Sequence, residues 1–157
     1  MQTGENAAGP IFAMTKGKRE SGAPTYTFGG RAEGNFGPIE IGIQAKRTGP
    51  RYVNDQNLPV GQSYSLFNAM GQPVPNSTVS YLVYNAKTPS YTLVDLDARI
   101  SLKPLGLNDQ TFLQLNITNL FNKFFVSGFG GNLSNTNVPN AYIGSPRAIS
   151  GTVNFAF

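Results

Sequence analysis

The sequence of 157 residues contains no cysteine, no histidine and no tryptophan. The first two absences exclude a disulfide framework, a zinc site and a Cys–His nucleophile system. Charged residues are also scarce, at 13% of the chain, whereas a soluble domain normally carries about 25% to stay solvated. We therefore expect neither an enzyme nor a bound cofactor, and the composition is unusual for a soluble protein.

Long apolar runs are missing as well. No stretch approaches the roughly 18–20 apolar residues of a membrane-spanning helix, no signal peptide opens the chain, and no helical apolar period persists. Glycine (18 residues) and proline (11 residues) are instead frequent, and the aromatic residues are all Tyr and Phe. This mixture is typical of many strands joined by turns and polar loops, so the predicted fold class is all-β.

Apolar and polar residues alternate with the period of a β-strand in several segments. The clearest segment spans residues 91–103. Similar alternation predicts strands over 26–33, 39–46, 110–119 and 148–157, with a weaker strand over 11–15. We expect short turns at 34–38 and 104–109, long polar loops at 54–89 and 128–141, and a shorter loop at 17–24. Short turns at one end and long loops at the other are typical of antiparallel, up-and-down transmembrane β-barrels.

The charged face of segment 91–103 predicts which side meets lipid. Exposing Arg99 near the bilayer midplane costs about 2–4 kcal/mol, and Asp95 and Asp97 cost less. We therefore expect the face that carries Val94 to point toward lipid. The three charged residues are then interpreted as a satisfied polar network in a wet interior, rather than as acid–base catalysts.

Two motifs near the C-terminus resemble the end of TonB-dependent outer-membrane receptors. The first is Leu115–Lys123, with the sequence LNITNLFNK and Phe124 and Phe125 directly after it, preceded by Leu93–Leu96 (LVDL). The second is Gly144–Arg147 (GSPR), and the chain then ends on an aromatic residue. Upstream, Thr48–Tyr52 (TGPRY) is also similar to the end of an earlier barrel strand in that family.

The resemblance implies a 22-stranded barrel filled by an N-terminal plug domain that contacts TonB. Residues 1–157 offer about five or six strands and no plug, so we expect a C-terminal fragment of one barrel domain, in which an open curled sheet is the isolated form. The implied function is import of a scarce nutrient, such as a metal–siderophore complex, cobalamin or an oligosaccharide. The implied location is the bacterial outer membrane, with lipid as a partner and TonB contacted only through the missing plug.

The resemblance also implies a role for the last strand. Outer-membrane barrels end on an aromatic residue preceded by alternating apolar residues, and the barrel-assembly machinery binds this pattern. Val153, Phe155 and Phe157 fit it. The alternative is that Phe157 only anchors the strand at the membrane interface, as girdle aromatics do.

Contacts with a small-molecule substrate are predicted in the long polar loop. Tyr64, Phe67, Tyr81 and Tyr84 are candidate stacking platforms, and Arg147 is a candidate contact for an anionic ligand. The alternatives are a mobile surface loop and a structural rim arginine, respectively. The net charge of +4 suggests no nucleic-acid partner, because the basic groups lie in predicted loops and rims without a recognition helix or stacked aromatic sheet.

Two other functions remain open at this point. A small pore assembled from several copies would have to bury both sheet edges by self-association. A soluble β-sandwich would pack the apolar faces together and bind glycans through its Tyr-rich loops. A requirement for detergent would separate these classes.

Overall fold

The computed structural model describes residues 3–6, 9–12, 15–132 and 138–156. These residues form an all-β structure. The strands are β1 Thr3–Asn6, β2 Gly9–Phe12, β3 Thr27–Phe36, β4 Ile39–Thr48, β5 Val60–Phe67, β6 Pro73–Tyr84, β7 Tyr91–Ser101, β8 Phe112–Thr118, β9 Val126–Asn132, β10 Pro139–Ile143 and β11 Ala148–Asn154. The short 3-10 turn η1 spans Lys103–Leu105. Among the described residues, no helix has the length and apolar character needed to cross a membrane.

The described residues divide into two compact units. One, the sheet unit, comprises Thr25–Gly49, Ser90–Phe125 and the residues from Ile143 onward. The other, the hairpin unit, contains the strand pairs β1–β2, β5–β6 and β9–β10.

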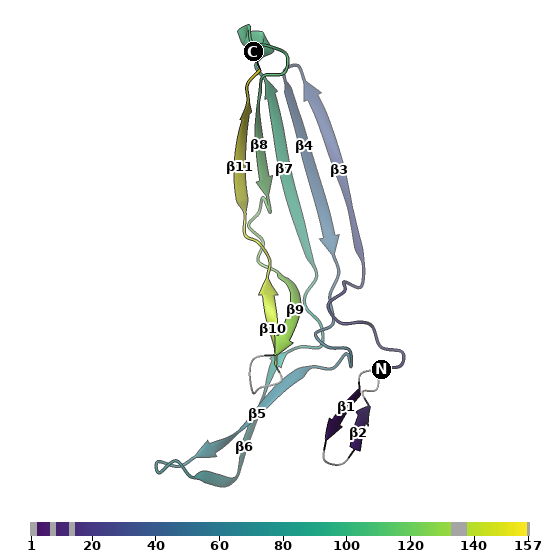
Figure 1. Ribbon diagram of the computed structural model, residues 1–157, viewed down its shortest axis with the longest axis vertical. Helices are drawn as coiled ribbons and strands as arrows, with labels where there is room; N and C mark the ends of the chain where they lie inside the picture. Colours follow the sequence, from purple (N-terminus) through teal and green to yellow (C-terminus); the bar gives the residue numbers. More distant parts are fainter. Residues whose placement is uncertain (1–2, 7–8, 13–14, 133–137, 157) are drawn as a thin grey trace. The chain divides into compact units, whose positions relative to one another are not determined.

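The sheet unit is a single antiparallel sheet of five strands in the order β11-β8-β7-β4-β3 (Figure 1). Its strands are the five that the alternating pattern predicts, so these predictions are confirmed. The sheet is open, and β3 and β11 form its two edges. The expected turn at 34–38 is shorter than predicted, because β3 continues to Phe36 and Gly37 turns the chain at a φ of 65°.

The register aligns apolar residues in rows that cross the whole sheet. One row is Ala32, Ile43, Leu96, Ile117 and Ile149; the next is Gly34, Ile41, Ala98, Leu115 and Gly151; the third is Phe36, Ile39, Ile100, Leu113 and Val153. Side chains alternate between the two faces along each strand. All three rows therefore lie on one face, and the residues between them lie on the other. A one-residue slip of any strand would mix the two sets.

The apolar face is solvent-exposed. Ile43, on the interior strand β4, is 44% exposed and Val153, on an edge strand, is 67% exposed. The five strands of the sheet unit form one sheet, so no second layer of described strands within this unit covers the face. The unit thus has two distinct faces, and neither forms a conventional hydrophobic core.

The prediction of two long polar loops is wrong, because both segments form strands of the hairpin unit. The segment 54–89 contains β5 and β6, which pair as a hairpin, and the segment 128–141 contains parts of β9 and β10. The sequence pattern does not predict these strands, because Ser, Thr, Gln and Tyr occupy positions that a core strand fills with aliphatic residues. The weak strand expected over 11–15 only overlaps β2, and residues 13–14 lie outside the described part of the chain.

The short loop at 17–24 is confirmed, and hydrogen bonds attach it to residues that follow β4. The Gly22 N–H donates to the Tyr52 carbonyl at 3.1 Å, and the Ser21 N–H donates to Asp55 Oδ1 at 2.8 Å. The Asn57 side chain also bonds the backbone of Arg19 in both directions at 2.8 Å. These contacts hold the polar connection in place without an apolar core.

Candidate functional site

The polar face of the sheet unit carries an ion-pair cluster that links strands distant in sequence. Arg31 on β3 donates two hydrogen bonds to the Asp97 carboxylate on β7, at 2.6 and 2.9 Å. The same guanidinium bonds Glu33 at 2.5 Å. This forked pairing matches the planar geometry of guanidinium and carboxylate groups. Arg31 therefore connects β3 to β7 across the intervening strand β4.

Gly42 on β4 makes this crossing sterically feasible. It lies in the row between Glu33 and Asp97. A Cβ atom at this position would fall 2.7 Å from Asp97 Oδ2 and closer still to the Arg31 guanidinium. Any other residue would thus displace the ion pair, so the glycine belongs to the cluster although it contributes no side chain.

The remaining charged residues of β7 have separate partners. Asp95 Oδ1 accepts a hydrogen bond from the Asn119 N–H at 2.8 Å, and the Arg99 guanidinium lies 3.9 Å from the centre of the Phe112 ring. Each residue of the expected polar network, Asp95, Asp97 and Arg99, thus has a partner on another strand or turn. Sequence reasoning missed Arg31, since only the strand register brings it to Asp97.

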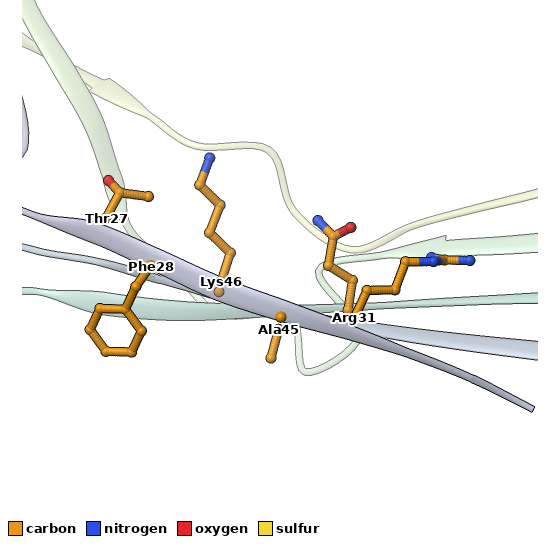
Figure 2. A pocket seen from close by; sticks show the side chains of 8 residues that line it. Thr27, Phe28, Arg31, Ala45 and Lys46 are labelled. Carbon is orange, nitrogen blue, oxygen red and sulfur yellow. The ribbon is translucent and has the colours of Figure 1, made fainter.

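A shallow hollow of about 300 Å³ lies over the β3–β4 pair (Figure 2). Figure 2 shows Phe28 and Ala45 pointing to one side of the strands, while Thr27, Arg31 and Lys46 point to the other. The hollow follows the free edge of β3, and we therefore interpret it as an unpaired sheet edge rather than a ligand pocket. Lys46 lies near the end of β4, within the strand predicted over 39–46.

The two motifs near the C-terminus meet in the sheet unit, where Asn119 connects them. Its side chain donates to the carbonyls of Lys123 and Ser145, both at 3.0 Å, and accepts a bond from the Lys123 N–H at 2.7 Å. Asn119 is buried, at 4% exposure, and its φ of 50° is left-handed. Asparagine tolerates this conformation better than most residues, which explains why an asparagine stands between strand β8 and the following turn.

Asn122 adds a second link between the motifs. Its side-chain oxygen accepts a bond from the Arg147 N–H at 3.0 Å, and its φ is 49°. Nearby, the Gly144 N–H donates to the Phe125 carbonyl at 2.9 Å. A Cβ atom at Gly144 would overlap the Phe125 ring. We call the residues Asn119, Asn122, Gly144, Ser145 and Arg147 the motif junction; it fixes where β11 begins relative to β8.

The predicted substrate contacts are distributed over both units. Tyr64 and Tyr81 form an edge-to-face pair on the β5–β6 hairpin, with ring centres 5.9 Å apart, whereas Tyr84 packs against Phe129 at 5.3 Å. Phe67 lies at the end of β5, with its side chain exposed. Arg147 belongs to the motif junction, where its backbone N–H bonds Asn122. Of the five predicted residues, the structure brings only Tyr64 and Tyr81 into contact.

The described residues of the predicted assembly signal lie at the end of β11 and just beyond it, with Val153 inside the strand. Val153 pairs with Leu113 in the apolar face of the sheet, and Phe155, beyond the end of β11, is more than half exposed. Phe157 lies outside the described residues. The Ala156 N–H donates to the Thr111 hydroxyl at 3.1 Å, so the backbone after β11 is anchored beside the start of β8.

No model of a known protein family matches the chain, and no characterised protein matches it in sequence. Within the described residues, no three acidic side chains are placed to hold a metal ion.

Proposed function

We propose that the chain forms part of the wall and the external loops of an outer-membrane nutrient transporter of the TonB-dependent type. The observation that carries the proposal is the sheet unit, in which three apolar rows cross all five strands on one uncovered face. Such a face is stable only in contact with a second apolar layer or with lipid.

Strand length and charge placement support lipid as that contact. Strands β3, β4 and β7 have 10, 10 and 11 residues, which suits the roughly 9–11 residues that a tilted strand uses to cross the hydrocarbon. Strands β8 and β11 are shorter, with 7 residues each. The Arg31–Asp97 pair lies on the opposite face, where the interior of a large barrel holds water.

The motif junction supports the family assignment within the proposal. The two motifs that resemble the end of TonB-dependent receptors are separate in sequence, yet they share direct hydrogen bonds through Asn119 and Asn122. A shared physical role explains why both motifs occur together in one chain. The open edges at β3 and β11 require further strands in the complete wall, since unpaired backbone groups are not tolerated in lipid.

Single-cysteine spin labelling tests the lipid contact directly, because the chain has no native cysteine that would also be labelled. The matched pairs are Ile43→Cys with Gln44→Cys on β4, and Leu96→Cys with Asp95→Cys on β7. Each labelled chain is reconstituted in phospholipid vesicles at high protein density, so that the open edges at β3 and β11 can pair with the same edges of other copies. Collision rates of the spin label are measured with oxygen, which dissolves in lipid, and with a water-soluble nickel chelate.

We expect labels at residues 43 and 96 to collide mainly with oxygen and labels at residues 44 and 95 mainly with nickel. Protection of residues 43 and 96 from both reagents would mean that a second protein layer covers the apolar face, and it would refute the proposal in favour of a β-sandwich. High nickel access at all four positions would mean that the chain does not insert, and it would refute the proposal as well.

A further inference from the structure

The β5–β6 hairpin has two chemically different faces, which its register defines. Gln62 pairs with Tyr81 and Tyr64 pairs with Val79, so these residues share one face. The opposite face carries the pairs Ser63–Ser80 and Ser65–Thr78. The Ser63 and Ser80 hydroxyls lie 2.7 Å apart. A shallow groove of about 340 Å³ beside them is lined by residues of both faces, including Gln62 and Tyr81. We call the Gln62, Tyr64 and Tyr81 side the aromatic face.

The aromatic face presents rigid rings next to a polar amide. Tyr64 and Tyr81 pack at an interplanar angle of 66° and remain 51% and 46% exposed. The Tyr81 hydroxyl donates to Gln62 Oε1 at 2.5 Å. This bond fixes the ring and the amide relative to each other, and it leaves the two N–H groups of Gln62 as donors. Aromatic surface next to oriented amide donors suits a ligand that is partly apolar and partly hydroxylated.

The absence of charged side chains from the hairpin further restricts the chemical class of ligand that it can bind. Residues 56–86 include no Asp, Glu, Lys or Arg, so the entire hairpin is neutral. A site for a phosphate, a carboxylate or a metal chelate would need cationic groups to offset desolvation of the ligand. Neutral sugars need no such groups, because their C–H faces pack on aromatic rings and their hydroxyls exchange hydrogen bonds with amides and serines.

We propose that the aromatic face of the β5–β6 hairpin binds an uncharged oligosaccharide. This inference rests on the proposed function for its biological role, which is capture of a saccharide substrate outside the membrane. Gln62, Tyr64 and Tyr81 contact the sugar, with the tyrosine rings stacking on adjacent residues of the glycan. An exposed apolar patch could also bind a second copy of the chain, but the amide and phenol groups at its centre favour a hydroxylated ligand.

The test measures binding of soluble glycans to the full chain by isothermal titration calorimetry in phosphocholine micelles, since maltoside detergents would compete. The probes are maltohexaose and cellohexaose as neutral glycans, and a hyaluronan hexasaccharide as the anionic comparison. The variants are Tyr81→Ala, Tyr81→Phe and Gln62→Ala. Tyr142→Ala is the matched control, because Tyr142 is an equally exposed tyrosine on β10 outside this hairpin.

We expect at least one neutral probe to bind and the anionic probe to bind at least tenfold more weakly. Tyr81→Ala should weaken binding about tenfold, which corresponds to the loss of one well-packed aromatic contact. Tyr81→Phe should weaken it about threefold through loss of the bond that orients Gln62, and Gln62→Ala should weaken it similarly. Tyr142→Ala should bind as the parent chain does. Equal losses for Tyr81→Ala and Tyr142→Ala, or tighter binding of hyaluronan, would overturn the inference.

The two proposals fail in distinguishable ways. If no neutral probe binds while the spin labels show lipid contact at residues 43 and 96, the saccharide site is refuted and the transporter wall stands. If a neutral probe binds with the expected variant pattern but the labels show no lipid contact, the saccharide site stands and its role in capture across a membrane is refuted. Circular dichroism of each variant checks that the strands are retained.

Discussion

Replacing Asn119 is expected to destabilise the sheet unit more than any other single polar substitution at the motif junction. Asn119→Ala removes three side-chain hydrogen bonds, two to the backbone of Lys123 and one to the carbonyl of Ser145. It also leaves alanine at a φ of 50°. Both effects act on a residue that is almost fully buried.

The expected decrease in the free energy of unfolding follows from these contacts. A net loss of about 1 kcal/mol for each hydrogen bond gives about 3 kcal/mol, and left-handed backbone at alanine adds about 1 kcal/mol. With a urea m-value of about 2 kcal/mol per molar, Asn119→Ala should lower the unfolding midpoint by about 2 M. Asn119→Gly loses the same bonds without the backbone strain, so its midpoint should fall by about 1.5 M.

Urea unfolding of the full chain in detergent micelles, followed by far-ultraviolet circular dichroism, measures these shifts. Asn35→Ala is the matched control, because Asn35 is exposed on β3 and its side chain makes no hydrogen bond to another described residue. Its midpoint should change by less than about 0.3 M. A shift for Asn119→Ala no larger than that of Asn35→Ala would show that the junction does not stabilise the sheet.

Two further predictions concern charged groups. Gly42→Ala should separate Arg31 from Asp97, so Asp97→Asn should lower stability in the parent chain and have no further effect in the Gly42→Ala background; additive effects in this double-mutant cycle would contradict the steric argument. Hydrogen bonds from the hydroxyl and the N–H of Ser21 lower the pKa of Asp55 below its ordinary value. The stability that the ionised Asp55 carboxylate contributes is therefore fully present above about pH 4. It is lost as the pH falls through the lowered pKa of Asp55. Asp55→Asn should remove that acid sensitivity in protection of the Ser21 amide from hydrogen exchange, and an unchanged pH profile would contradict the assignment.

Much of the sheet unit is predictable from sequence, because each of its strands alternates apolar and polar residues over most of its length. β7 spans Tyr91–Ser101, which is two residues shorter than the expected segment 91–103. A one-residue shift in register would move the apolar side chains of a strand to the other face, so this alternation restricts the possible registers. Short connections between neighbours in sequence explain the pairs β3–β4 and β7–β8, whereas long segments separate β4 from β7 and β8 from β11.

The hairpin unit is much less predictable, for a physical reason. Strands β5 and β6 lack aliphatic alternation, and their pairing rests on Ser, Thr, Gln and Tyr contacts that sequence patterns also associate with loops. The ion pair between Arg31 and Asp97 is equally difficult to predict from sequence, since it depends on the register of three strands at once. One signal was available: Gly42 interrupts an otherwise regular alternation on β4, and a glycine inside a strand often marks a close approach by another group.

The sheet unit has an odd number of antiparallel strands, and this number restricts how a closed wall could be completed. Direction reverses at each of the pairs β11–β8, β8–β7, β7–β4 and β4–β3, so the edge strands β11 and β3 run the same way. Joining these edges directly, within one copy or head to tail between identical copies of the unit, creates a parallel seam. Closing the wall with antiparallel neighbours throughout requires an odd number of additional strands between β11 and β3, which gives the even total of bacterial membrane barrels. The arithmetic disfavours a ring built from this sheet alone and favours one completed by strands of a different sequence.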